Sequence, residues 1–229
     1  MLAVIGDIHG CFFTLKKLCN ELKDKYPGVP VYSVGDLVDR GNYSFEVMDF
    51  ILTQSIAFTP GNHEYMFYYF FHFPDSALAK AWIYNGSWKT LSSYQDKMHF
   101  LYEHLKVIIN SPLYFDTEDC FISHAGIADI YKIELPEPPL EFPSLFDELV
   151  KKEVESENGI LWNRKKLMNL GKLQVVGHTR KVEIERIEEN NSVYIDTAAI
   201  TNNKLTAVLI DNNKIKDIIS VSTLAEDTL

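Results

Sequence analysis

The sequence predicts an α/β fold in which two mixed sheets pack face to face as a sandwich, with helices on the outer faces and a helical insertion near one sheet edge. The first third of the chain repeats a unit of strand, polar loop and amphipathic helix three times. Residues 65–118 are rich in aromatic side chains, and the last third is rich in short apolar runs. Strands that alternate with helices predict a mainly parallel sheet, and the later strands predict a second sheet packed on the first.

The first unit begins with the apolar residues 2–5, a run that ends at Gly6 and is typical of a strand buried on both faces. A polar loop follows at 7–10. The helix after this loop is predicted from four apolar side chains at helical spacing, namely Phe12, Leu15, Leu18 and Leu22.

The same unit recurs twice along the chain. Strands are expected at 31–34 and 56–59, polar loops at 35–41 and 61–64, and helices after Ser44 and from Tyr65 onward. In a parallel sheet, the loops that follow the strands lie at the same edge, where ligands commonly bind. All three polar loops are therefore expected to meet there.

Residues 65–118 carry no strand pattern, so we expect a helical insertion that turns at Asn85-Gly86 and packs over the sheet edge. A length of 229 residues fits one domain, 1–229. Further strands are predicted at 120–123, 173–176, 193–195, 205–210 and 215–221, with a hairpin turn at 211–213.

Composition excludes several classes of protein. A formal charge of −10 argues against general nucleic-acid binding, which depends on Lys and Arg. The chain has no run of about 20 apolar residues that could span a membrane and no secretory signal at its start. Three widely spaced cysteines, Cys11, Cys19 and Cys120, suit a reducing compartment. These features predict a cytoplasmic protein without membrane contact.

Five short polar segments carry the groups that could perform chemistry, and each segment follows a predicted strand. Each motif alone is weak, because Asp, His and Gly are common in turns. Together they gather carboxylates, imidazoles and an amide at one edge, a set of ligands that suits Mn²⁺, Fe or Zn²⁺. The segments are Gly-Asp7-Ile-His9-Gly, Gly-Asp36-Leu-Val-Asp39-Arg40-Gly, Gly-Asn62-His63-Glu64, His124-Ala-Gly and Gly-His178-Thr.

The order of these motifs resembles the PPP-type metallophosphatases of the calcineurin-like superfamily, most closely the bacterial and phage Ser/Thr protein phosphatases of the lambda phage type. The resemblance extends over almost the whole chain, because Asn85-Gly86, the segment 161–164 and the segment 194–197 also fall in corresponding order. It implies the calcineurin-like fold and two divalent metal ions, with Mn²⁺ expected and Fe or Zn²⁺ as alternatives. It also implies that a metal-bound hydroxide attacks phosphorus directly.

The resemblance further implies a role for individual residues. Asp7 and His9 would bind the first metal, and Asp36 would bridge both metals. The second metal would be completed by Asn62, which would also contact substrate, together with His124 and His178.

His63 would be the general acid, oriented by Asp39. Arg40 and Arg164 would grip the phosphate oxygens, because guanidinium groups match phosphate geometry. For Arg164, a surface arginine beside Lys165 and Lys166 is the competing interpretation.

For the substrate, a phosphoprotein cleaved at phosphoserine or phosphothreonine is the main hypothesis. The alternative is a symmetrical dinucleoside tetraphosphatase, which shares most of these motifs. Glu64 favours the protein phosphatase, because the nucleotide hydrolases usually carry Asp at that position. A non-catalytic scaffold on the same fold would require the loss of ligands that this sequence retains. Two positions depart from the family pattern: Pro60 replaces a common Arg, and Ala198 replaces the usual Gly.

Overall fold

A computed structural model describes residues 1–228 of the chain and contains two five-stranded sheets. The first sheet has the order β10-β9-β1-β2-β3, in which β1, β2 and β3 run parallel and β9 runs antiparallel to β1. Val4 in β1 is paired with Tyr32 of β2 on one side and with Val208 of β9 on the other. The strands are β1 (Leu2–Ile5), β2 (Val31–Ser33), β3 (Ala57–Phe58), β9 (Lys204–Asp211) and β10 (Lys214–Ser222).

The second sheet has the order β4-β5-β6-β8-β7, with β5, β6 and β8 parallel and antiparallel strands at both edges. Both sheets are therefore mixed, and the predicted sandwich is confirmed. The edge strand β7 was not predicted, because its exposed Glu and Arg side chains lack the alternation of a half-buried strand. The strands are β4 (Tyr114–Asp116), β5 (Phe121–Ser123), β6 (Gln174–Val176), β7 (Glu185–Ile187) and β8 (Ser192–Tyr194).

The two sheets bury a common apolar layer between their inner faces. Tyr32 of the first sheet packs against Phe115 of the second with ring centroids 5.1 Å apart. Burial of such side chains stabilises the sandwich by roughly 1.5–3 kcal/mol for each large apolar residue. The layer contains Leu2, Val4, Val34, Val208 and Ile210 on one side and Ile122, Val175, Val193 and Ile195 on the other.

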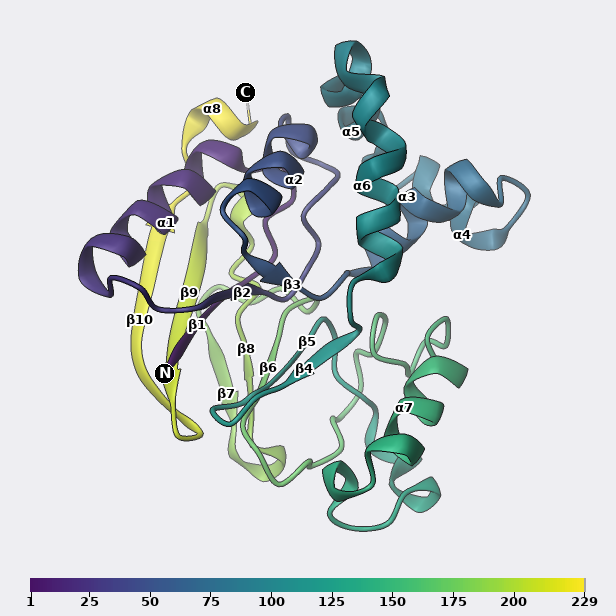
Figure 1. Cartoon of the computed structure of the whole chain (residues 1–229), viewed down its shortest axis with the longest axis vertical. Helices are drawn as coiled ribbons and strands as arrows, with labels where there is room; N and C mark the ends of the chain where they lie inside the picture. Colours follow the sequence, from purple (N-terminus) through teal and green to yellow (C-terminus); the bar gives the residue numbers. More distant parts are fainter. Residues whose placement is uncertain (229) are drawn as a thin grey trace.

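Helices cover the outer faces of the sandwich (Figure 1). The helices α1 (Phe12–Lys25) and α2 (Ser44–Thr53) pack on the first sheet, and α7 (Pro143–Lys152) packs beside the second. The short helix α8 (Ala225–Thr228) closes over the start of α1. The 3₁₀ turns are η1 (Gln95–Lys97), η2 (Asp129–Glu134), η3 (Pro139–Glu141), η4 (Glu188–Asn190) and η5 (Ala199–Thr201).

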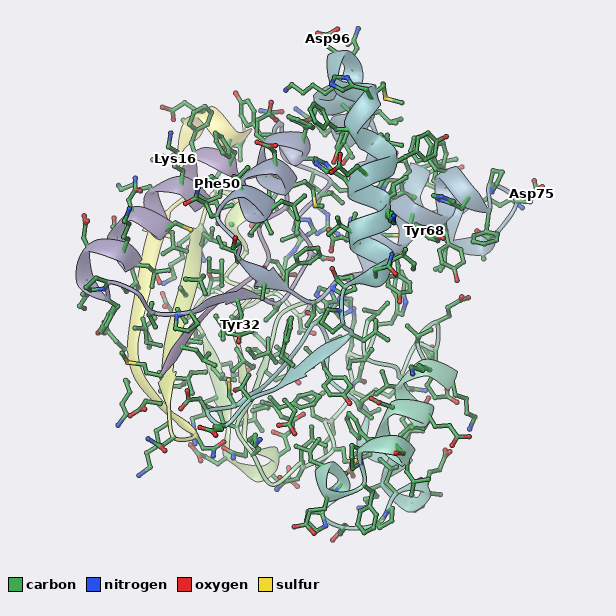
Figure 2. The ribbon with its side chains drawn as sticks, viewed as in Figure 1. Lys16, Tyr32, Phe50, Tyr68, Asp75 and Asp96 are labelled. Carbon is green, nitrogen blue, oxygen red and sulfur yellow. The ribbon has the colours of Figure 1, made fainter. Side chains whose placement is uncertain are left out.

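The predicted insertion is helical and projects from the end of the sandwich, with Asp75 and Asp96 at its outer tips (Figure 2). Gly86 forms the predicted turn, and its φ of 97° requires a residue that tolerates the left-handed region. The helices are α3 (Asn62–His72), α4 (Ala77–Ile83), α5 (Ser87–Tyr94) and α6 (Met98–Asn110).

Two predicted boundaries of the insertion are wrong. Residues 62–64 form the first turn of α3 rather than a loop, because Glu64 caps its own helix by accepting a hydrogen bond from the Gly61 N–H. Tyr114–Asp116 forms β4, so the insertion ends before residue 118. Among residues 1–228, no helix has both the length and the apolar character needed to cross a membrane.

Candidate active site

Five of the predicted site residues lie in the left-handed region of backbone space. His9 has φ 47°, Asp36 49°, Asp39 70°, Arg40 70° and His178 62°. Such a conformation costs roughly 1–2 kcal/mol for each L-residue. A fold that retains five of them must hold them by surrounding contacts, and strain of this kind gathers at functional sites.

Glu64 provides one such set of contacts. Its buried carboxylate accepts hydrogen bonds from the main-chain N–H groups of Asp36 at 2.8 Å, Leu37 at 2.7 Å, Val38 at 3.1 Å and Gly61 at 2.7 Å. Burial raises the pKa of Glu64 to about 7, and the nearby negative charge of Asp36 adds to this rise. Glu64 therefore shapes the loop that carries Asp36, and it does so without facing the cleft.

Asn62, His124 and His178 converge on one point. Asn62 Oδ1 lies 3.0 Å from His124 Nε2 and 3.0 Å from His178 Nδ1, and the two ring nitrogens are 3.2 Å apart. Asp36 Oδ1 lies 3.5 Å from His124 Nε2. Ligand atoms about 2.1 Å from one metal ion and at right angles to each other are separated by about 3.0 Å. The spacing of these four side chains fits a divalent cation.

The protonation of the histidines also fits a cation. Nδ1 of His124 donates to Val34 O at 2.9 Å, and Nδ1 of His9 donates to Val38 O at 2.9 Å, so both Nε2 lone pairs point into the site. Burial lowers the pKa of His9 and His124, and it lowers the pKa of His178 to about 2. These rings are therefore neutral at pH 7, the form that binds metal.

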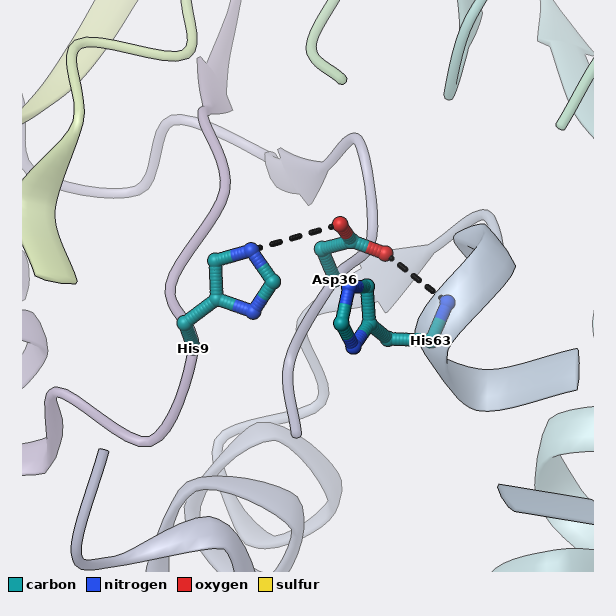
Figure 3. Close-up of side chains that lie close together, drawn as sticks. All are labelled: His9, Asp36 and His63. Atoms are coloured by element: carbon teal, nitrogen blue, oxygen red, sulfur yellow. Dashed lines mark hydrogen bonds and ion pairs between the residues drawn. The ribbon is translucent and has the colours of Figure 1, made fainter. Parts of the chain in front are cut away.

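His9, Asp36 and His63 form a second group of possible ligands, which shares Asp36 with the first (Figure 3). His9 Nε2 lies 3.3 Å from Asp36 Oδ2, and the main-chain N–H of His63 donates a hydrogen bond to Asp36 Oδ1 at 3.1 Å. The guanidinium of Arg40 donates to His9 Nε2 at 2.5 Å and to His63 Nε2 at 2.7 Å. Two groups that share one carboxylate are the arrangement expected of a bridged pair of ions.

Asp7 lies beside these groups but belongs to neither of them. Its two carboxylate oxygens accept hydrogen bonds from the main-chain N–H of His178, Oδ1 at 3.2 Å and Oδ2 at 3.1 Å. Burial raises the pKa of Asp7 well above its usual range, and the charges of Asp196 and Asp36 add to this effect. Three buried carboxylates that repel one another would be stabilised by a bound cation.

Asp196 was not among the predicted site residues, although it lies in the segment 194–197 that matches the family. It follows β8 and is buried at the same sheet edge. Its carboxylate accepts a hydrogen bond from the Ala198 N–H at 2.9 Å.

His63 and Asp39 form a buried pair, in which His63 Nδ1 donates to Asp39 Oδ2 at 2.6 Å. The helical insertion holds Asp39 in place. Trp82 Nε1 donates to Asp39 Oδ2 at 2.7 Å, and Thr90 Oγ1 donates to Asp39 Oδ1 at 2.6 Å. Trp82 is thus both a buried aromatic side chain of the insertion and a hydrogen-bond donor to the site.

A cleft of about 370 Å³ opens above these groups. Three arginines line it: the predicted Arg40 and Arg164, and also Arg180. Arg164 is largely exposed, and its Nη1 donates to His178 O at 3.3 Å. Burial lowers the pKa of Arg40, with Asp36 opposing this change and the positive charge of Arg180 adding to it. The cleft is suited to bind an anion above the metal-ligand side chains.

A family model confirms the assignment that the motifs suggest. The model for calcineurin-like phosphoesterases matches residues 1–193. This chain belongs to the calcineurin-like phosphoesterase family. It is therefore a metallophosphoesterase, a hydrolase whose family uses divalent metal ions.

Similar sequences in this family are dinucleoside polyphosphate hydrolases by name. A protein of Anoxybacillus flavithermus named asymmetrical bis(5'-nucleosyl)-tetraphosphatase PrpE is 28% identical, and the match covers 90% of this chain and 88% of the relative. A protein of Bacillus mycoides with the same name is 27% identical over the same shares of both chains. These similar sequences do not confirm the predicted likeness to Ser/Thr protein phosphatases.

Solved structures support the fold. The cold-active protein-tyrosine phosphatase of a Shewanella species has a TM-score of 0.61 at 17% identity, covering 97% of this chain and 80% of the other. At this identity the likeness concerns the fold alone. This calcineurin-like phosphoesterase therefore shares its overall fold with that phosphatase.

Proposed function

We propose that this calcineurin-like phosphoesterase hydrolyses dinucleoside tetraphosphates at a site that holds two divalent metal ions. The observation that carries the proposal is the cleft itself, in which three arginines lie above two groups of metal-ligand side chains that share Asp36. A phosphate monoester carries about two negative charges, whereas a tetraphosphate bridge carries about four. Three guanidinium groups in one cleft suit the more highly charged chain.

The names of the similar sequences support the same substrate class. This substrate class is the alternative to a phosphoprotein, which the identity of Glu64 favours on sequence grounds. Glu64 makes four main-chain hydrogen bonds and does not line the cleft, so its identity carries little information about the substrate. The relatives are asymmetrical enzymes by name, whereas the alternative expected from the motifs is the symmetrical reaction.

For the metals, we propose that His9 and Asp7 hold the first ion and that Asp36 bridges to the second. The second ion would be completed by Asn62, His124 and His178, whose ligand atoms lie 3.0–3.2 Å apart. Bound divalent ions supply Lewis-acid charge and lower the pKa of coordinated water. Mn²⁺ is the proposed ion, because oxygen and imidazole donors without thiolate accept it.

For the reaction, Arg40 and Arg164 would hold the non-bridging phosphate oxygens, with Asn62 in contact with the same group. His63 would act in its doubly protonated form and donate a proton from Nε2 to the leaving oxygen, while the Asp39 carboxylate at Nδ1 would orient the ring and stabilise its positive charge. The 2.6 Å contact between His63 Nδ1 and Asp39 Oδ2 supports this division of roles.

The proposal is tested by assaying the Mn²⁺-loaded protein side by side on diadenosine tetraphosphate and on a phosphoserine peptide, with a chelated control. Faster, chelator-sensitive hydrolysis of the dinucleotide is expected. Preference for the phosphopeptide would overturn the proposed substrate and restore the protein phosphatase hypothesis. Activity that survives chelation would overturn the metal site.

A further inference from the structure

A second hollow of about 490 Å³, which we call the apolar recess, adjoins the phosphate cleft. Its apolar wall comes from Leu78 and Ala81 on α4 and from Trp162, which lies two residues before Arg164. Arg164 lines both the apolar recess and the phosphate cleft. A ligand with a phosphate in the cleft and a flat apolar group in the recess would therefore contact this arginine from both sides.

The chemistry of the apolar recess is complementary to a nucleoside. Trp162 is partly buried and contributes an aromatic side chain to the wall of the recess, on which a flat base could pack. The recess is also lined by Glu155 and Glu157, the latter paired with Lys165 at 3.2 Å. Carboxylates repel phosphate but accept hydrogen bonds from ribose hydroxyls or a base amino group, so the recess selects the uncharged part of a nucleotide.

We infer that the apolar recess binds the nucleoside next to the attacked phosphate and thereby places its α-phosphate at the metal-ligand groups. The inference rests on the proposed function. Because Arg164 borders both hollows, the phosphate attached directly to a nucleoside in the recess would be the one nearest to the cleft. A nucleoside held in the recess would direct hydrolysis to the α-phosphate, and the products would be a nucleoside monophosphate and a nucleoside triphosphate.

The bond changes are those of anhydride hydrolysis. The water oxygen forms a bond to the α-phosphorus, and the bond from that phosphorus to the bridging oxygen breaks. The bridging oxygen leaves with the triphosphate and takes a proton from His63. The protons of the attacking water restore the proton of His63 and otherwise pass to the phosphate products or to solvent according to pH. Diadenosine tetraphosphate and water thus give AMP and ATP, with no change in oxidation state.

The test uses two variants of the full chain that change the apolar recess and leave the metal-ligand side chains in place. Ala81→Trp fills the recess, and Leu78→Ser removes part of its apolar wall. Leu91→Ser on α5 is the matched control, because Leu91 is an exposed leucine of the same insertion that does not line the recess. Tripolyphosphate is the control substrate, because it has anhydride bonds and no nucleoside.

For the wild type, chromatography is expected to detect AMP and ATP from diadenosine tetraphosphate. Both recess variants should raise KM for this substrate about tenfold or more, because each loses a buried apolar contact with the nucleoside. Hydrolysis of tripolyphosphate should be unchanged, because this substrate has no nucleoside. Titration calorimetry with Mn²⁺ present should show wild type binding AMP more tightly than inorganic phosphate, and the recess variants losing this preference.

Two outcomes overturn the inference while the proposed function stands: release of two ADP, or an unchanged KM for the dinucleotide in both recess variants. Absence of dinucleotide hydrolysis overturns the proposed function instead. In that case calorimetry still decides about the recess, because AMP binding no tighter than phosphate binding would contradict it.

Discussion

His63 Nδ1 lies 2.6 Å from Asp39 Oδ2, and both side chains are buried. A carboxylate accepts hydrogen bonds only, so the imidazole carries its proton on Nδ1 and directs Nε2 toward Arg40 and the cleft. This pair joins the loop that follows β2 to the first turn of α3. The position of the proposed acid therefore depends on residues that never touch substrate.

Replacement of His63 by Asn is expected to reduce turnover by a factor that depends on the basicity of the leaving group. A phosphoserine alkoxide is strongly basic and needs a proton, so its hydrolysis should fall about 10²–10⁴-fold. A triphosphate leaving group is a weak base, and its release should fall only about tenfold or less. Equal losses on a phosphoserine peptide and diadenosine tetraphosphate would contradict the role of His63 as an acid.

Trp82 should act as a positioning residue, because its Nε1 donates to Asp39 at 2.7 Å. Trp82→Phe removes this donor and is expected to cost about 1–3 kcal/mol in the free energy of unfolding. It should also shift the pH profile of turnover, because the carboxylate that holds His63 loses a hydrogen bond. Trp88→Phe is the control, since Trp88 is 61% exposed on the same insertion. A destabilised Trp82 variant with an unchanged pH profile would indicate a role in packing alone.

Removal of metal should destabilise the protein, because Asp7, Asp36 and Asp196 are buried carboxylates, and burial together with the charge of Asp36 raises the pKa of Asp7 and Asp196. Mn²⁺ at 100 times its dissociation constant should add about 2.7 kcal/mol to the free energy of unfolding. Asp36→Asn should lose this gain and nearly all activity. Asp49→Asn, an exposed acid on α2, should keep both. A Mn²⁺-dependent rise in the unfolding temperature of Asp36→Asn equal to that of wild type would refute the bridging role.

Arg180 should matter more for long phosphate chains than for monoesters, because Arg40 and Arg164 suffice for one phosphate group. Arg180→Ala is expected to raise KM for diadenosine tetraphosphate about tenfold, the effect of one lost charge-assisted contact. KM for p-nitrophenyl phosphate should change little. Arg186→Ala serves as control, since Arg186 is exposed and paired with Glu188. Equal effects on both substrates would argue against a role in polyphosphate binding.

The position of the site could be predicted from the sequence because it depends on local patterns. Each strand is a short apolar run and each polar loop follows it directly, so parallel pairing is enough to bring the loops together. His124 and His178 follow β5 and β6 and reach Asn62 in this way. Their convergence needed no knowledge of individual contacts.

The missed features depend on contacts between residues far apart in sequence. Arg180 has no sequence neighbour that distinguishes it from a surface arginine, and only the folded cleft brings it near Arg40. The hydrogen bond from Trp82 to Asp39 spans 43 residues of sequence. The structural role of Glu64 cannot be predicted from the sequence, because its main-chain partners in the loop at 36–38 are 26–28 residues away.

Ala198 is the departure from the family pattern with the clearest structural cost. Its φ of 59° lies in the left-handed region, where an L-residue with a Cβ is strained and glycine is not. Ala198→Gly should therefore increase the free energy of unfolding by about 1 kcal/mol, the relief of strain less the added entropy of the unfolded chain. The hydrogen bond from residue 198 N–H to Asp196 involves only the main chain at 198 and is retained.

The matched control is Ala199→Gly at the adjacent, buried position, which begins η5 without a positive φ. There the substitution relieves no strain and should lower stability by roughly 0.5–1 kcal/mol. Opposite signs at two neighbouring alanines, measured from urea midpoints, would isolate the backbone conformation as the cause. A loss of stability in both variants would mean that surrounding contacts hold Ala198 without appreciable strain. Activity should be unchanged in Ala198→Gly, because the Asp196 carboxylate keeps its partner.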